Sequence, residues 1–153
     1  MKTIASFTVN HDKLEKGIYV SRIDGDVVTY DIRMKKPNGG DYLSNGAMHT
    51  FEHLFATYAR NSTLSESVIY VGPMGCRTGF YFLLRGTVSR DEALRLVRES
   101  FHFIADFEGV IPGSKRQECG NYLEHDLAKA KDIAEDMLAV LINWTGEKMK
   151  YEI

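Results

Sequence analysis

The stretch GFYFLLRGTVSRDE, residues 79–92, decides the fold, because a strand pattern here runs directly into the start of a helix. Residues 79–88 are mostly aromatic or β-branched and are typical of a strand. Ser89 with Glu92 three residues later forms a capping box, which predicts a helix that begins right after the strand. Apolar residues continue this helix at Leu94, Val97, Phe101 and Ile104.

The other strands are found on the N-terminal side of this stretch. Residues 17–23 and 27–34 flank an Asp-Gly-Asp turn, which predicts a β-hairpin. Residues 67–72 form another β-branched run and predict a strand that precedes a glycine-rich turn. The sheet is therefore expected to consist of this hairpin and the two strands on either side of that turn.

Two further helices complete the pattern. The first is expected to be capped by Ser44 or Asn45 and to end near Asn61, because apolar residues recur between them at spacings of three and four. The last helix is expected to start at Asn121, with Glu124 three residues on, and to end near Gly146.

The order strands, helix, strands, helix, helix favours an α+β fold over a doubly wound parallel sheet. We expect a single domain over residues 1–153, with a largely antiparallel sheet and helices packed on one face. Residues 80–85 carry apolar side chains on both faces of their strand. A second copy of the chain is expected to cover the free face, which would give a homodimeric two-layer sandwich.

Composition excludes several classes of function. The chain has 153 residues, 44% of them hydrophobic and 26% charged, and a formal net charge of −2. The basic residues are dispersed, so we expect no nucleic-acid partner. No apolar run approaches membrane-spanning length, and residues 1–7 lack the apolar core of a secretory signal. We therefore expect a cytoplasmic protein with no membrane partner.

The segment His49-Thr50-Phe51-Glu52-His53 carries the strongest chemical signal. On a helix, His49 and His53 lie one turn apart on the same face, an arrangement that can grip a divalent metal. Glu52 lies at the edge of that face, where a carboxylate can shuttle protons. Surface histidines are the ordinary alternative for a single imidazole, but they are a weaker explanation for this pair with a glutamate between.

The cysteines also lie in unusual surroundings. Cys76 lies in a glycine-rich turn at 72–79, and Cys119 is followed by Gly120. Glycine lets the backbone approach a ligand closely, whereas isolated cysteines can also be small buried hydrophobic residues. His49, His53 and Cys119 together would form a three-ligand site with an open position, the pattern of a catalytic metal, although spacing alone does not assign the third ligand.

The motifs, taken together, resemble those of the S-ribosylhomocysteine lyase family, the bacterial enzymes that make the precursor of autoinducer-2. The resemblance covers nearly the whole chain, in the family's order. It is carried by SFTVNH at 6–11, DIR at 31–33, HTFEHLFA at 49–56, PMGCRTG at 73–79 and CGNY at 119–122.

The resemblance implies a metal site with catalytic groups beside it. His49, His53 and Cys119 match the metal ligands of the family. The metal in the family is Fe(II), one per chain, for which Zn or Co(II) can substitute. Cys76 matches a catalytic thiolate base, and Glu52 matches a second acid/base.

The resemblance also implies how the substrate is held. Ser6, His11 and Arg33 match substrate-binding residues, in a site shared between the two protomers of a homodimer. The partner's N-terminal segment is expected to complete the pocket. One departure is the run 70–72, Tyr-Val-Gly, where many family members have Asp-Ile-Ser. The usual Asp helps to hold the homocysteine end of the substrate, so this contact is in question here.

The activity implied by the family is cleavage of the thioether of S-ribosylhomocysteine to homocysteine and 4,5-dihydroxy-2,3-pentanedione. The carbonyl would migrate along the sugar through enediolates, and β-elimination would then release the thiol. In the family this reaction is linked to quorum sensing and to recycling of a methylation by-product, and the sequence leaves open whether the chain serves signalling or only recycling.

Two other classes of function stay open on the residues alone. The order H-x-x-E-H also occurs in zinc peptidases of the inverzincin type, which would use Glu52 to activate water and need no cysteine ligand. A non-catalytic metal-binding module is the other alternative. His102 and His125 fit no motif, and each is expected to be a surface histidine or a core histidine with its hydrogen bonds satisfied; for His125, six residues past Cys119, a supporting role beside the metal ligands is the alternative.

Overall fold

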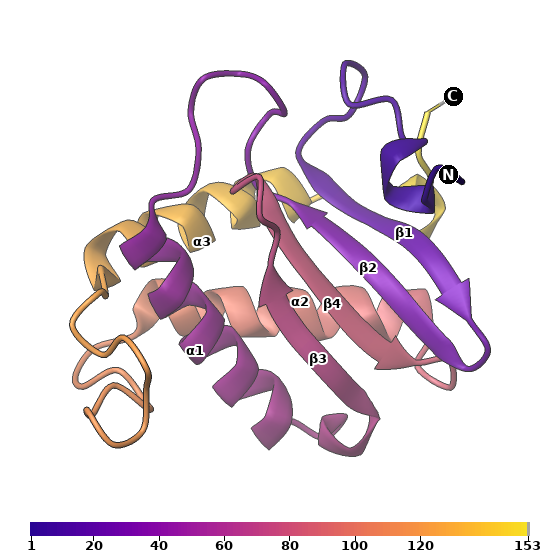
Figure 1. Cartoon of the computed structure of the whole chain (residues 1–153). Coiled ribbons are helices and arrows are strands. Elements are labelled where there is room, and N and C mark those ends of the chain that lie inside the picture. Colours follow the sequence, from indigo (N-terminus) through magenta and orange to yellow (C-terminus); the bar gives the residue numbers. More distant parts are fainter. Residues whose placement is uncertain (153) are drawn as a thin grey trace.

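The computed structural model describes residues 1–152, in which helices pack on one face of an antiparallel sheet (Figure 1). The strands are β1 (Gly17–Asp24), β2 (Val27–Arg33), β3 (Val68–Pro73) and β4 (Gly79–Arg85). The helices are α1 (Asn45–Asn61), α2 (Arg90–Asp106) and α3 (Leu127–Leu141). Short 3₁₀ turns occur at Ala5–Phe7, Ser65–Ser67 and Gly146–Lys148. This confirms the predicted α+β class.

The sheet order is β1-β2-β4-β3, and each neighbouring pair is antiparallel. The hairpin turns at the predicted Asp-Gly-Asp, where Gly25 has φ of +60°, a conformation that glycine adopts without strain. In the register, Tyr30 lies opposite Phe82 and Ile32 opposite Phe80. All four side chains are buried, because this face of the sheet carries the helices.

The predicted helix starts are right for two helices and wrong for the third. Ser44 caps α1 by accepting from the Ala47 N–H, and Ser89 forms the predicted capping box. The last helix begins at Leu127, not at Asn121, and it ends at Leu141. Its cap is Asp126, whose carboxylate accepts from the Lys129 N–H directly before the apolar run.

The core is aromatic where α1 meets the sheet and α2. The ring of Phe51 lies 5.3 Å from that of Phe80 and 5.0 Å from that of Phe101, between ring centroids. Phe55 lies 4.9 Å from Phe82 and packs on Phe101 as well. These contacts fix the position and the rotation of α1. They therefore also fix where the backbone presents the side chains on the other edge of this helix.

The other face of the sheet is less covered. Tyr81 and Leu83 are half-buried there, and Tyr70, opposite Leu83, is 54% exposed. Both termini lie beside β1 at one end of the sheet (Figure 1). Among residues 1–152, no helix is long and apolar enough to span a membrane.

We predict that Gly17→Ala destabilises the fold. A Cβ at this position would lie 2.3 Å from Cη2 of Trp144, whose indole N–H donates to the Ile18 carbonyl. Relieving the clash should cost about 1–3 kcal/mol of unfolding free energy, measured by urea denaturation. Gly75→Ala is the matched control, because no atom lies within 4 Å of its added Cβ. Equal stability of the two variants would contradict the tight packing at Gly17.

Candidate active site

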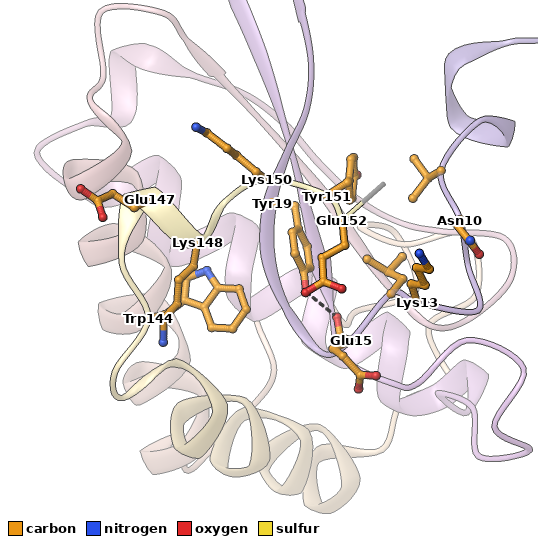
Figure 2. A pocket seen from close by; sticks show the side chains of 12 residues that line it. Asn10, Lys13, Glu15, Tyr19, Trp144, Glu147, Lys148, Lys150, Tyr151 and Glu152 are labelled. Atoms are coloured by element: carbon orange, nitrogen blue, oxygen red, sulfur yellow. Dashed lines mark hydrogen bonds between the residues drawn. The ribbon is translucent and has the colours of Figure 1, made fainter.

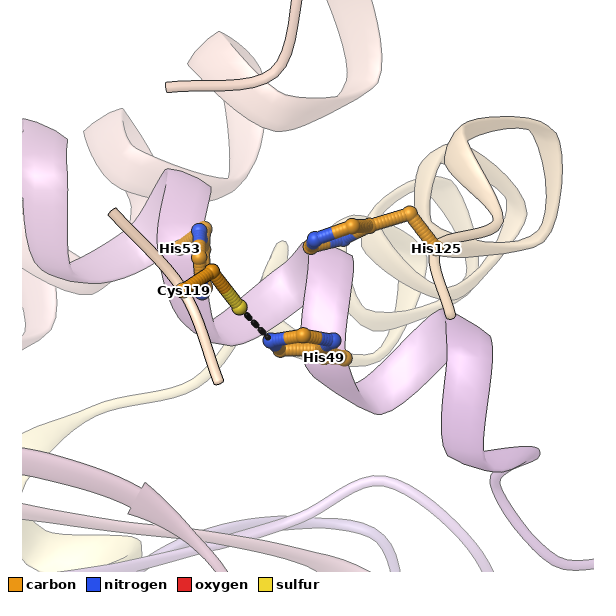
Figure 3. A group of neighbouring side chains, drawn as sticks. All are labelled: His49, His53, Cys119 and His125. Atoms are coloured by element: carbon orange, nitrogen blue, oxygen red, sulfur yellow. Dashed lines mark hydrogen bonds between the residues drawn. The ribbon is translucent and has the colours of Figure 1, made fainter. Parts of the chain in front are cut away.

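Helix α1 places His49 and His53 side by side, with ring centroids 4.6 Å apart. Cys119 approaches from the loop between α2 and α3, and its Sγ lies 3.3 Å from His49 Nε2. His125, from the end of the same loop, completes a group whose donor atoms all lie within 4.8 Å of one another (Figure 3). The structure thus brings together the three expected ligands, and it adds a histidine.

Backbone carbonyls fix the orientation of two of these rings. His49 Nδ1 lies 2.8 Å from the Glu124 carbonyl oxygen, and His53 Nδ1 lies 2.8 Å from that of Pro112. A carbonyl oxygen only accepts, so each Nδ1 carries the proton and each Nε2 keeps its lone pair. His49 Nε2 is the atom that faces Cys119, so the lone pair points into the group.

A glycine lets the loop close over His53. Gly113 has φ of +69°, and a Cβ there would lie 3.2 Å from His53 Nδ1. A larger residue would strain the turn and push the loop away from the ring. The ring nitrogens and the thiol sulfur lie within 4.8 Å of one another, and such a set of nitrogen and sulfur donors fits a divalent metal such as zinc or iron.

His125 departs from the sequence expectation, while His102 follows it. His102 is exposed on α2, as expected. His125 is neither a surface nor a satisfied histidine, because its Nε2 is buried and has no hydrogen-bond partner among residues 1–152. Its ring stacks on that of His49, with centroids 4.0 Å apart. Burial lowers the pKa of His125, and the charges of His49 and His53 lower this pKa further.

Glu52 lies on the edge of α1 next to His53. Its half-buried side chain lines a cavity of about 330 Å³ together with His53 and Tyr70. The remaining lining residues are Ala56, Thr57, Val71, Pro112 and Gly113. We call His49, His53, Cys119 and His125 the metal-type group. The Glu52 carboxylate is close to this group without belonging to it, as a proton-transfer group requires.

Cys76 lies elsewhere, in the turn between β3 and β4. It lines a second cavity of about 330 Å³ together with Ser6, His11 and Arg33, so the expected substrate-binding residues gather around the expected base. The four side chains of the metal-type group are not among the residues that line this cavity.

A chain of polar contacts, buried at Asp31, Arg33 and Thr78, runs from the exposed Cys76 to the C-terminal segment. Arg33 donates to the Thr78 hydroxyl oxygen at 2.8 Å, and Thr78 Oγ1 lies 3.0 Å from Cys76 Sγ. With its oxygen already accepting, the Thr78 hydroxyl can donate its proton to the sulfur. Arg33 also donates to Asp31 at 2.6 Å, and the Tyr151 hydroxyl donates to the same carboxylate oxygen at 2.7 Å.

The charge of Asp31 helps to raise the pKa values of Arg33 and Tyr19. Burial alone would lower the pKa of Arg33, but the charge of Asp31 and the hydrogen bond to it raise the pKa above its ordinary value, and Cys76 contributes in the same direction. Burial, and then the charge of Asp31, raise the pKa of Tyr19 to about 12. Arg33 therefore brings a permanent positive charge to the cavity of Cys76.

Asp31, Thr78 and Tyr151 belong to this site and were not expected from the sequence as functional residues. Asp31 Oδ1 and Arg33 Nε are buried and have no hydrogen-bond partner within the described part of the chain. The only sequence signal for Asp31 is its place in the Asp-Ile-Arg motif. Tyr151 reaches the site from the far end of the chain, which no local pattern predicts.

Tyr70 occupies the position where the sequence departs from the usual family pattern. Its ring lies over Gly72, where an added Cβ would be 2.4 Å from both Cε2 and the hydroxyl oxygen of Tyr70. The ring thus fills the space that a side chain at 72 would need, and it also lines the cavity that Glu52 lines.

A third cavity, of about 390 Å³, lies between the segment after the first 3₁₀ turn and the C-terminal residues (Figure 2). Tyr19 forms part of its wall, with its hydroxyl donating to the Glu15 carbonyl oxygen. Charges of both signs surround it, from Lys13, Lys148, Lys150, Glu15, Glu147 and Glu152. Its described lining residues include no histidine or cysteine, and it shares Val9 and Tyr151 with the cavity of Cys76.

Comparison with known proteins decides the family. The S-ribosylhomocysteinase (LuxS) family profile matches residues 4–148. The chain belongs to this family. It is 49% identical to the S-ribosylhomocysteine lyase of Phocaeicola vulgatus, over 99% of this chain and 98% of that protein. It is 47% identical to the lyase of Clostridium acetobutylicum, over 99% of both chains. The same-named protein of Borreliella burgdorferi is 46% identical, also over 99% of both.

We predict that His49, His53 and Cys119 are each needed for metal binding. His49→Ala, His53→Ala and Cys119→Ala should each weaken binding of Zn(II) or Co(II) by at least about tenfold, because each removes one of three protein ligands. Metal content after dialysis against a competing chelator measures the loss. His102→Ala is the control, because His102 is exposed on α2. Full metal content in Cys119→Ala would remove Cys119 from the ligand set.

Proposed function

We propose that the chain is a metal-dependent lyase that cleaves the thioether of S-ribosylhomocysteine to homocysteine and 4,5-dihydroxy-2,3-pentanedione. One observation carries the proposal: imidazole and thiol donors converge within 4.8 Å on a chain that matches the family over nearly its full length. The relatives named above carry the name of this lyase. The product is the precursor of autoinducer-2, so the chain would serve autoinducer synthesis.

The thioether sulfur can leave only after a neighbouring carbon is deprotonated. The ribose carbonyl therefore has to migrate along the sugar through enediolates until it lies β to the C–S bond. The last proton abstraction then breaks that bond, and the electron pair leaves with the homocysteine sulfur. No oxidant is needed, because one proton is lost from carbon and one proton is gained by the homocysteine thiol.

We assign Cys76 and Glu52 as the two acid/base groups. His49, His53 and Cys119 would hold a divalent metal, which as a Lewis acid stabilises negative charge on the sugar oxygens. Cys76 takes protons from carbon, and Thr78, 3.0 Å away, can hydrogen-bond to its sulfur. Glu52 lies beside His53 in a cavity wall and can pass protons between oxygen and carbon.

We assign substrate binding to Ser6, His11 and Arg33. They line the cavity of Cys76, and His11 Nδ1 donates to the Val9 carbonyl oxygen at 2.8 Å, which leaves its Nε2 for a sugar hydroxyl. The unpaired Arg33 Nε and Asp31 Oδ1 offer a donor and an acceptor in the same region.

A zinc peptidase is the main alternative from another class. Such a peptidase would need Glu52 beside the metal but neither the cavity of Cys76 nor the buried Arg33. Peptide cleavage that survives Cys76→Ala would favour the peptidase. A metal-binding module without catalysis would retain metal and release no thiol from S-ribosylhomocysteine.

We propose Fe(II) as the metal in the cell, one ion per chain, with Zn or Co(II) able to substitute. Imidazole with thiolate suits both iron and zinc, and His49, His53 and Cys119 offer that set. We place the protein in the cytoplasm, because Cys76 and Cys119 are both free thiols and a reducing compartment keeps them so. We also propose that residues 1–153 form a single domain.

We propose a homodimer with shared active sites. Within one chain, no side chain of the metal-type group lines the cavity of Cys76. A complete site would therefore combine the cavity of one protomer with the metal of its partner. Apolar side chains are available for the contact: Phe7 is 74% and Ile4 is 54% exposed near that cavity, and Tyr70 is 54% exposed on the sheet. Pairing would bury these side chains and exclude water from the sugar.

The activity itself is tested by thiol release. Anaerobically handled protein should release homocysteine from S-ribosylhomocysteine, while Cys76→Ala and Glu52→Gln should bind normal amounts of metal and turn over at least about 10²-fold more slowly. A thiol-reactive dye measures the rate, and His102→Ala should behave as the unmodified chain. Near-normal turnover in either variant would remove that residue from proton transfer.

Iron should make the enzyme sensitive to oxidation. Peroxide or air should inactivate the Fe(II) form faster than the Zn or Co(II) form, because iron can reach Fe(III) whereas the cysteine damage is common to all forms. Residual thiol release after timed exposure gives the rates. Equal rates for all metals would show that iron chemistry does not drive the loss.

Shared sites predict a specific pattern of recovery in mixed dimers. Cys76→Ala mixed with Cys119→Ala should regain activity after subunit exchange, because one site would combine an intact cavity with an intact metal group. Cys76→Ala mixed with His11→Ala should not recover, because both residues line the same cavity. A monomer by sedimentation, or no recovery in the first mixture despite proven exchange, would contradict shared sites.

A further inference from the structure

We propose that His125 is a hydrogen-bond donor to the substrate oxygen that enters between His49, His53 and Cys119, and that it is not a metal ligand. This inference rests on the proposed function for the identity of that oxygen. The position of His125 does not rest on the proposed function. Its ring stacks on that of His49 with an interplanar angle of 18°, and it meets the ring of His53 edge to face (Figure 3).

The protonation of the ring follows from the hydrogen bonds around Thr50. The buried hydroxyl oxygen of Thr50 accepts from the Asp126 backbone N–H at 2.9 Å. It also lies 3.0 Å from His125 Nδ1. Among residues 1–152, the structure shows no other acceptor for the hydroxyl proton, and we infer from this that the threonine donates and Nδ1 accepts.

An imidazole whose Nδ1 accepts must carry its proton on Nε2. Nε2 of His125 is therefore an N–H group, and it is buried with no partner among residues 1–152. A buried donor without an acceptor is costly, so the folded chain keeps it unpaired only where something else accepts. Since Nδ1 is held by Thr50, Nε2 is the nitrogen left to face the group of donor atoms.

His125 thus differs from its neighbours in what its ring can do. His49 and His53 donate from Nδ1 to carbonyl oxygens and keep Nε2 lone pairs for a metal. His125 has the opposite tautomer and presents a proton. The arrangement leaves three protein ligands and one open position, instead of a closed four-ligand site. A donor beside an open position stabilises the negative charge that an enediolate oxygen develops.

The tautomer can be tested on the unmodified chain. In the Zn(II) form labelled with ¹⁵N, long-range proton–nitrogen correlation should show His125 protonated at Nε2 and bare at Nδ1. His49 and His53 should show the reverse protonation, with Nε2 shifted by the metal. A metal-shifted Nε2 on His125 would overturn the proposal, and this measurement requires neither substrate nor a variant.

A pair of variants distinguishes the roles of the two ring nitrogens of His125. His125→Asn keeps an acceptor near the Nδ1 position for Thr50 but removes the Nε2 donor, whereas His125→Gln keeps an amide donor near Nε2. Both should bind Co(II) with normal stoichiometry and an unchanged visible spectrum, because no ligand is lost. A smaller metal content in His125→Asn, or a shift of its thiolate-to-cobalt band, would place Nε2 on the metal or on Cys119 and overturn the proposal.

Acetate serves as an oxygen probe of the open position. Its affinity for the Co(II) form, read from the visible spectrum, should fall about tenfold or more in His125→Asn and recover in part in His125→Gln. Turnover of S-ribosylhomocysteine should fall about 10²-fold in His125→Asn. Unchanged acetate affinity would overturn the donor role. Absence of turnover in the unmodified chain would instead overturn the lyase function, while the acetate result would still stand.

Discussion

The packing of α1 against the sheet is the interaction on which the rest of the structure depends. Phe51 and Phe55 insert between β4 and α2, and this fixes both the position and the rotation of the helix. His49 and His53 lie on the edge of the same helix, so the core contacts also fix where the imidazoles point. Their Nδ1 hydrogen bonds then tie the loop between α2 and α3 to the helix, and that loop carries Cys119. The packing of the core therefore also determines the position of the metal-type group.

Local patterns predicted what lies within one element. The strands, the hairpin turn, the capping box at Ser89 and the pairing of His49 with His53 all follow from spacing along the chain. The start of α3 did not, because residues 120–123 form a turn that does not continue into a helix, and Asp126 caps the helix five residues after Asn121. The role of His125 depends on Thr50, which is 75 residues away, and no period or motif reports such a contact.

In the cavity of Cys76, too, sequence motifs identified some residues, while their partners from distant parts of the chain were not predicted. Arg33 and Cys76 stand out in the sequence, but the residues that make their placement stable come from elsewhere. Burying Arg33 is costly unless its charge is paired, and Asp31 and Thr78 supply partners at 2.6 and 2.8 Å. Tyr151 then shares the carboxylate, which ties the C-terminal segment to the sheet. Asp31 Oδ1 and Arg33 Nε have no hydrogen-bond partner among residues 1–152, so the network leaves one acceptor and one donor unused within the described chain.

Tyr70 and Gly72 show how a departure from a family pattern can be a coupled change. With the Tyr70 ring 2.4 Å from the position of a Cβ at 72, a serine there and this ring placement exclude each other. A carboxylate at 70 would leave that space empty, and a serine could then occupy position 72. The two positions therefore have to be considered together, and the cavity that Glu52 and His53 line has the uncharged aromatic ring of Tyr70 among its lining side chains.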